Sequence, residues 1–367
     1  MEDAALASET GQGGGRMRPP GDFLRRIGED GKVVIRSPNW IGDAVMSLPA
    51  IQAVRQSLPD TPISILAKPW VADLFRGNPE RCQVIVYESP GNHRGLRGRW
   101  ALARKLRQEK FNGGILLPNS FDSALIFFLA GIPHRAGYNT DGRRIFLTHA
   151  VPVNRRIKEG HQVGYYRHLI RSLGFDDSQA RPRLGVEASQ KKQAMKKAQA
   201  LGLEDRKEWV GISPGAAYGS AKEWFPERYG ELAERIAAQW NCQILLLGSS
   251  SERPVTGRLN PKAPIPIIDL VGRTTLGEAM ALISRCRAFI GNDSGLMHVA
   301  AALGVPTVAI FGSTDPRRTG PVGETCRVIQ RPIPCSPCFK ARCPQNRECM
   351  ERISVDEVFE EVRRIFS

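Results

Sequence analysis

The sequence lacks the features that mark membrane-spanning, secreted or nucleic-acid-stacking proteins. No apolar run approaches the roughly 18 residues of a membrane helix, and the longest, Ala124 to Ile132, is too short. Residues 1–30 are acidic, polar and rich in glycine, so no secretory signal is visible and a cytoplasmic location is expected. Aromatic residues make up only 7% of the chain and do not interleave with its basic stretches, which argues against a protein that stacks nucleic acid bases.

Three short motifs with known chemistry are also absent. The chain contains no G-x-G-x-x-G, which argues against an NAD-dependent oxidoreductase. It contains no G-x-x-x-x-G-K-[ST], which argues against a P-loop nucleotidase. It contains no Asp-x-Asp either, so a diphosphate bridged by a metal ion is not indicated.

Positive charge is abundant and uneven. The 367 residues carry a formal charge of +15, of which −2 falls on residues 1–30, +11 on residues 31–187 and +6 on residues 188–367. Such a field attracts anions such as nucleic acid, acidic lipid headgroups or a phosphorylated substrate. The alternative is a composition that is rich in arginine throughout, with no particular partner.

Short apolar strands alternate with helices twice along the chain. The first series has strands at 33–35, 63–66, 84–86 and 114–117, with a helix that runs through Val54. The second has strands at 209–212, 244–247, 288–290 and 307–311. This pattern predicts an α/β protein with two doubly wound parallel-sheet domains that face each other across a cleft. The expected parts are a flexible extension (1–31), an N-terminal domain (32–187), a C-terminal domain (188–353) that begins with an exposed helix, and a C-terminal helix (354–367).

Three segments that follow strands carry the polar residues of interest. The first is Asn39-Trp40-Ile41-Gly42-Asp43, where a glycine turn leads to an acidic residue near a helix start. The second, Ser213 to Trp224, brings Lys222 into a loop of small residues that a phosphate can approach. The third, Asn292 to His298, opens a helix whose free N–H groups suit an anion. For each segment the alternative is structural: a capping residue, a solvated lysine or a packed histidine.

Taken together, these segments resemble the glycosyltransferases of family 9, which add heptose to the lipopolysaccharide inner core. The resemblance spans residues 32–366, and the Lys-x-Trp form at 222–224 is most similar to the members that add the second heptose. It implies the GT-B architecture, with two Rossmann-like domains, the acceptor held by the first and the nucleotide sugar by the second.

The resemblance also implies substrates and roles. Heptose would pass from ADP-L-glycero-D-manno-heptose to heptosyl-Kdo2-lipid A with inversion, at the cytoplasmic face of the inner membrane, with no cofactor required for catalysis and no nucleic acid partner. Asp43 would be the general base. The implied donor-binding residues are Ser220, Lys222, Glu252, Thr274, Thr275, Asp293, Ser294, Gly295, Leu296 and His298. The implied acceptor-binding residues are Asn39, Trp40, Arg94, Arg97, Arg143 and Arg144.

Four of the eight cysteines cluster in residues 335–349, at Cys335, Cys338, Cys343 and Cys349. The spacing C-x2-C with two further thiols suits a structural zinc ion, but the second pair is not C-x2-C. Disulfides and free thiols remain alternatives, and no catalytic role is assigned to the cluster.

Other functions stay open at this point. The chain could be the family member that adds the first heptose, or a nucleotide-sugar epimerase of the same architecture. A basic nucleic-acid-binding protein is the alternative from another class, and salt-sensitive binding to an oligonucleotide would support it.

Overall fold

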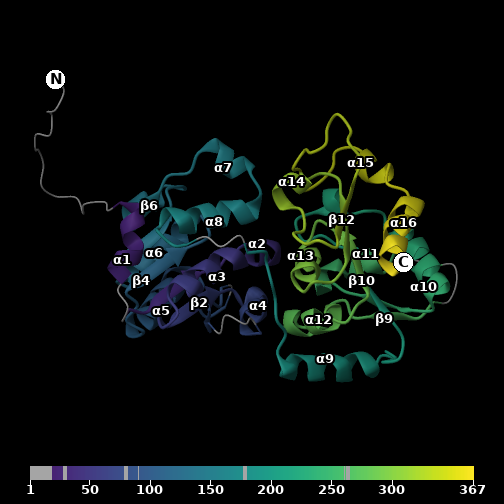
Figure 1. Cartoon of the computed structure of the whole chain (residues 1–367), viewed down its shortest axis with the longest axis horizontal. Helices are drawn as coiled ribbons and strands as arrows, with labels where there is room; N and C mark the ends of the chain where they lie inside the picture. Colours follow the sequence, from purple (N-terminus) through teal and green to yellow (C-terminus); the bar gives the residue numbers. More distant parts are fainter. Residues whose placement is uncertain are drawn as a thin grey trace, which may run out of the picture.

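The computed structural model of the chain describes residues 19–27, 31–77, 82–89, 91–176, 180–259, 261 and 265–367. Within these ranges, no helix is both long enough and apolar enough to cross a bilayer. Figure 1 shows two α/β halves side by side, the N-terminal half in purple to teal and the C-terminal half in teal to yellow.

Each half is built on a six-stranded sheet in which all strands are parallel. The strands of the first sheet are β1 (Val33–Arg36), β2 (Ile63–Ala67), β3 (Gln83–Val86), β4 (Gly113–Leu116), β5 (His134–Tyr138) and β6 (His149–Val151), in the order β3-β2-β1-β4-β5-β6. Those of the second are β7 (Trp209–Ser213), β8 (Gln243–Leu246), β9 (Ile267–Asp269), β10 (Ala288–Asn292), β11 (Thr307–Phe311) and β12 (Cys326–Gln330), in the order β12-β11-β10-β7-β8-β9. Both orders are the same Rossmann order, so the predicted pair of doubly wound sheets is confirmed.

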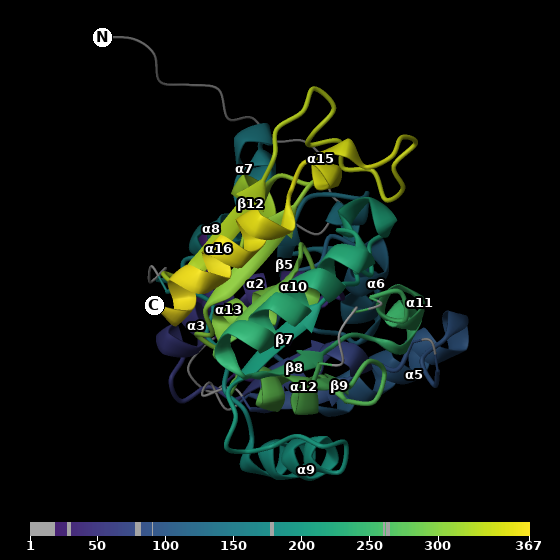
Figure 2. The ribbon, with the colours of Figure 1, turned by 90° about the vertical axis from the view of Figure 1, so that its right-hand side faces the viewer.

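Helices cover both sheets. Those of the N-terminal half are α1 (Phe23–Ile27), α2 (Ile41–Met46), α3 (Leu48–Ser57), α4 (Asp73–Arg76), α5 (Gly95–Gln108), α6 (Phe121–Leu129), α7 (Arg155–Glu159) and α8 (Gln162–Ser172). Those of the C-terminal half are α9 (Ala188–Gln199), α10 (Pro226–Trp240), α11 (Arg253–Thr256), α12 (Leu276–Ile283), α13 (Gly295–Ala302), α14 (Pro316–Thr319), α15 (Glu348–Glu351) and α16 (Val355–Phe366). The C-terminal helix α16 packs on α10 (Figure 2). The Trp240 and Phe366 rings of these helices are stacked with their centroids 4.3 Å apart.

The sequence-based expectation is wrong at three places. The flexible extension was expected to reach residue 31, but its described part forms α1, whose Phe23 is fully buried against His149 and Phe175. The helix expected through Val54 is two helices, because Pro49 cannot donate the hydrogen bond that would continue the first. Strands β5, β6, β9 and β12 were not predicted, since they lie at or near sheet edges and are short or mixed in polarity.

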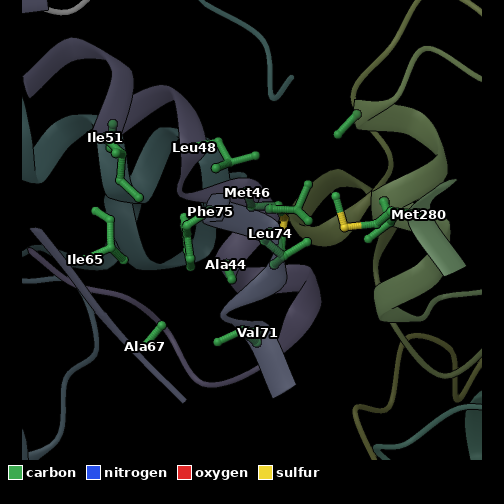
Figure 3. Packing of buried hydrophobic residues seen from close by; sticks show 14 of the residues in the cluster. Ala44, Met46, Leu48, Ile51, Ile65, Ala67, Val71, Leu74, Phe75 and Met280 are labelled. Carbon is green, nitrogen blue, oxygen red and sulfur yellow. The ribbon is translucent and has the colours of Figure 1, made fainter. Parts of the chain in front are cut away.

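One hydrophobic cluster spans the two halves. Helix α2 packs against α13, and α4 packs against α12. In Figure 3, Met280 of α12 points toward Leu74 and Met46 of the N-terminal half. The contact places the carboxyl edges of both sheets around one region, where ligands of doubly wound sheets bind.

Candidate functional site

The three sequence segments meet at the join of the two halves. The segment with Asp43 follows β1, the one with Lys222 follows β7, and the one with Asp293 follows β10. Strands β1 and β7 are central in their sheets, next to β4 and β10, where the strand order reverses. Parallel sheets open a crevice at this switch point, so topology brings Asp43 together with Lys222 and Asp293, which lie 179 and 250 positions further along the chain.

Asp43 lies in the first turn of α2 and faces the C-terminal half. Trp40 is the N-cap residue of this helix, so Asp43 does not have that role. Burial raises the pKa of the Asp43 carboxyl to about 6, with a smaller upward effect from Asp293 and a downward effect from Lys222. These two influences come from the other half of the chain, which shows that the three charged groups lie within electrostatic reach of one another.

Lys222 and Asp293 form an ion pair with 2.6 Å between Nζ and Oδ2. The side chains are only 14% and 5% exposed. The Thr314 hydroxyl donates to the same Asp293 oxygen at 2.8 Å. The carboxylate therefore fixes the ammonium of Lys222 at the join, instead of being free for a ligand.

His298 is buried one turn into α13, and burial lowers the pKa of its imidazole to about 4. The ring is therefore neutral at pH 7 and supplies no positive charge to a phosphate. A Cβ at Gly42 would lie 2.8 Å from its Cδ2 atom, and a Cβ at Gly295 would lie 2.7 Å from the Cβ of Ile41. The glycines of both motifs allow α2 and α13 to approach this closely.

A cavity of about 780 Å³ opens beside this contact. It gathers six of the expected donor residues, namely Glu252, Thr274, Thr275, Ser294, Gly295 and Leu296. The Ser294 hydroxyl is buried and has no hydrogen-bond partner among the described residues. The Glu252 carboxylate accepts from the Ser249 N–H at 2.6 Å, and a Cβ at Gly215 would lie 2.3 Å from it. The Thr275 hydroxyl caps α12 by accepting from the Glu278 N–H.

Ser220 lies elsewhere. It lines a separate cavity of about 200 Å³ with Arg347 and Cys343. The Ala221 N–H beside it donates to the Ala341 carbonyl at 3.0 Å, and Arg347 donates to the Glu223 carbonyl at 2.9 Å. The cysteine-rich segment therefore holds the loop that carries Lys222.

The cysteines of this segment are free thiols in the structure. Cys335 is exposed, Cys338 and Cys343 are partly buried, and Cys349 is buried. Burial raises the pKa of the Cys349 thiol, and the other three thiols add to the shift, so all four are near one another. Among the described residues no group of three or more His, Cys, Asp or Glu side chains is arranged to hold a metal ion.

The expected acceptor residues divide between surface and interior. Trp40 is 57% exposed, and Arg94, Arg97 and Arg144 are exposed. Arg143 is a correction, because its side chain is fully buried and donates to the Tyr138 carbonyl at 2.9 Å. Its remaining hydrogen bonds go to the Pro118 carbonyl and to Asn119, so the guanidinium is used inside the fold.

Sequence reasoning missed the contribution of the N-terminal half to the large cavity. Its lining includes Trp70, Asp73, Arg76 and Glu88, which follow β2 and β3. Their positions just beyond predicted strands were the sequence feature that could have indicated them. Without the order of the strands in each sheet, however, the sequence does not show that these residues lie opposite the loops after β7 and β10.

Comparisons with known proteins agree with this geometry. The model of glycosyltransferase family 9 (heptosyltransferase) matches residues 99–348. The chain is similar to lipooligosaccharide heptosyltransferase 2 of Haemophilus influenzae, with 33% identity over 81% of this chain and 88% of that protein. It is 32% identical to lipopolysaccharide heptosyltransferase 2 of Escherichia coli K12 over 82% of this chain and 88% of that protein. The solved structure of E. coli ADP-heptose lps heptosyltransferase II matches with a TM-score of 0.77 and 28% identity, over 91% of this chain and 98% of that one.

Proposed function

The chain belongs to glycosyltransferase family 9, the heptosyltransferases, and from this premise we propose that Asp43 and Lys222 carry out heptose transfer across the join of its two halves. It is a glycosyltransferase with two facing parallel-sheet domains, the GT-B arrangement, and acts in heptose transfer to the lipopolysaccharide inner core. The donor in the proposal is ADP-heptose and the acceptor is heptosyl-Kdo2-lipid A, in line with the relatives that add the second heptose.

One observation carries the assignment of roles. Asp43, from the N-terminal half, lies within electrostatic reach of the Lys222–Asp293 pair, from the C-terminal half. Asp43 and Asp293 lie close in the chain to Ile41 and Ser294, which line the nucleotide-sized cavity. A carboxylate opposite a fixed ammonium beside such a cavity is what a transfer between an alcohol and a sugar diphosphate needs.

Asp43 is the general base of the proposed reaction. Its pKa of about 6 keeps the carboxyl mainly ionised at pH 7 while bringing it close to the working pH, which favours proton transfer. The carboxylate takes the proton of the acceptor hydroxyl as the oxygen attacks the anomeric carbon. The bond from that carbon to the diphosphate oxygen breaks, ADP leaves, and the configuration is inverted.

Lys222 neutralises the charge that develops on the departing diphosphate. Ser294, Gly295 and Leu296 stand at the N-terminus of the eight-residue helix α13 and line the cavity. Their backbone N–H groups are further hydrogen-bond donors for the same phosphates. Glu252 is proposed to bind ribose hydroxyls, with Thr274 and Thr275 on the adenine side. With a lysine in this position and no Asp-x-Asp in the chain, the proposed transfer requires no metal ion.

The acceptor lies over the N-terminal half, at Asn39, Trp40, Arg94 and Arg97. Exposed arginines near a bilayer add roughly 1 kcal/mol each to attraction by anionic lipid. We propose peripheral association with the inner membrane on this ground. Vesicles with and without acidic lipid test it, since binding that ignores lipid charge contradicts it.

The decisive experiment measures ADP release from ADP-heptose with no acceptor, with Kdo2-lipid A, and with heptosyl-Kdo2-lipid A. The proposal expects release that depends on the last acceptor. Release with Kdo2-lipid A alone would assign the first heptose instead. No release with either acceptor, from folded protein, would refute the proposed substrates.

A further inference from the structure

A third, smaller cavity of about 120 Å³ lies in the N-terminal half, at the carboxyl ends of β1, β2 and β3. We call it the Lys68 cavity, and its charged lining residues are Arg36, Lys68, Arg99 and Asp122. The space equals that of about four water molecules, which suits one small ionic group and is too small for a sugar ring.

The charges around the Lys68 cavity do not balance. Among the described residues that line it, Asp122 is the one carboxylate, and it already pairs with Arg99 and accepts from the Tyr87 hydroxyl at 3.1 Å. This leaves Arg36 and Lys68 without a carboxylate of their own in the described lining. Since buried charges are normally paired, the cavity has two cations in excess.

Arg36 is buried, with 2% exposure. Its two terminal nitrogens donate to the Ser37 and Leu66 carbonyls and to Asn39, but its Nε has no hydrogen-bond partner among the described residues. An unpaired donor in a buried guanidinium is costly, so an acceptor bound at this atom would stabilise it.

Lys68 is 8% exposed. Its ammonium donates to the Ser89 carbonyl at 2.6 Å and lies 3.7 Å from the centre of the Tyr87 ring. Burial and the neighbouring Arg36 lower the pKa of Lys68 to about 8, which shows that its charge is poorly compensated. An anion in the cavity would restore the compensation.

The surroundings supply further donors. Gly95, at the start of α5, and Ser120 and Ser123, around the start of α6, line the same cavity. Both helices are long enough for their N-termini to favour an anion. The cations, hydroxyls and helix ends therefore converge on one small space.

Asn39 connects this space to the proposed catalytic site. Its side chain accepts from Arg36, its carbonyl accepts from the Trp70 indole N–H at 2.7 Å, and Asp43 follows four residues later. We propose that the Lys68 cavity binds one anionic group of the acceptor, a carboxylate or a phosphate, and thereby orients the acceptor hydroxyl toward Asp43. The identity of the molecule that bears the anion rests on the proposed function, whereas anion binding itself does not.

The first test titrates inorganic phosphate and acetate into the full-length protein in the presence of ADP, which occupies the donor cavity. The variants are Lys68→Met, Arg99→Gln on the partly exposed wall, and Lys32→Met as control. Lys32 is exposed and precedes β1, at the opposite edge of the same sheet, so its variant makes the same charge change away from the cavity.

The proposal expects an anion that binds to the wild type and to Lys32→Met, with at least tenfold weaker binding to Lys68→Met and Arg99→Gln, since a charge-assisted hydrogen bond is lost. Unchanged affinity for ADP shows that each variant is folded. No anion binding by the wild type, or equal binding by all four proteins, overturns the proposal.

The second test identifies the source of the anion. The KM for the acceptor is measured with the native acceptor, with its sugar carboxylates methyl-esterified, and with its lipid phosphates removed. One of the two modifications is expected to raise the KM of the wild type about tenfold and to leave the KM of Lys68→Met unchanged. The group removed by that modification is the one that the cavity binds. If neither modification has this effect, the cavity does not bind the acceptor. Failure of heptose transfer with every acceptor counts against the proposed function alone, because the titration still reports on the cavity.

Discussion

Lys222 and Asp293, 71 residues apart in the chain, form a buried ion pair at the ends of adjacent strands β7 and β10. The pair holds an ammonium where the two halves meet, and the carboxylate oxygen that contacts it also accepts from the hydroxyls of Thr314 and Thr319. Lys222 is therefore a fixed positive charge, in contrast to a flexible surface lysine.

Replacing Lys222 tests whether its positive charge binds the diphosphate. We expect Lys222→Met to weaken ADP binding about tenfold or more and to slow transfer further, because the leaving diphosphate loses its counter-charge. The buried Asp293 also loses its partner, so the melting temperature should fall. Lys192→Met, on the exposed face of α9, is the matched control and should change neither quantity. Equal ADP affinity in the two variants would contradict the assignment.

The pH dependence of transfer should report on Asp43. With the pKa of its carboxyl at about 6, the rate under kcat/KM conditions should fall about tenfold per unit as the pH drops below 6. Affinity for ADP, measured over the same range, should change much less. Asp43→Asn should abolish transfer and keep ADP binding. A rate that stays level down to pH 5 would show that another group takes the proton.

The same pKa makes a prediction about stability. Burial raises the carboxyl pKa of the folded state from 3.8 to about 6, so the folded protein holds this proton more tightly between those values. The free energy of unfolding therefore decreases as pH rises through this window, by up to about 3 kcal/mol.

Asp43→Asn removes the ionisation. We expect the inactive variant to be more stable than the wild type at pH 7, and the difference to vanish below pH 4. Denaturant unfolding at several pH values measures it. A variant that is less stable at pH 7 would show that the carboxylate stabilises the fold.

Gly42 should tolerate no side chain. A Cβ there would lie 2.8 Å from the buried His298 ring, so Gly42→Ala has to separate α2 from α13. We expect a loss of roughly 1–3 kcal/mol in stability and a large loss of transfer, because Asp43 moves with α2. Gly164→Ala, inside α8 with open space around it, is the control and should be neutral or slightly stabilising. Comparable effects of the two variants would rule out the close contact as the cause.

Arg347 should act on the donor without touching it. Its guanidinium donates to the Glu223 carbonyl and lies 4.6 Å from the centre of the Phe225 ring. These two contacts of Arg347 hold the loop that carries Lys222 in place. Arg347→Ala is expected to raise the KM for ADP-heptose several-fold with a smaller change in kcat, and Arg347→Lys should restore part of it. The control is Arg342→Ala, at an exposed position in the same segment. A pure loss of kcat would argue against a positioning role.

The sequence determined the fold class and the position of the site along the chain. Runs such as Val33-Val34-Ile35 are apolar and β-branched throughout, which fits only strands buried on both faces, and their alternation with helices predicts parallel sheets. Because ligands of such sheets bind beyond the carboxyl ends of strands, the sequence alone indicates the segments at Asp43, Lys222 and Asp293 as the site.

Tertiary structure decided what these residues do to one another. The raised pKa of Asp43 depends on burial against the opposite half, and the neutrality of His298 depends on its packing under Gly42. Tertiary structure also separates two neighbouring arginines. Arg143 is buried and donates to a backbone carbonyl, whereas Arg144 is exposed. Burial and charge pairing are long-range properties, and a local sequence pattern does not contain the distances that set them.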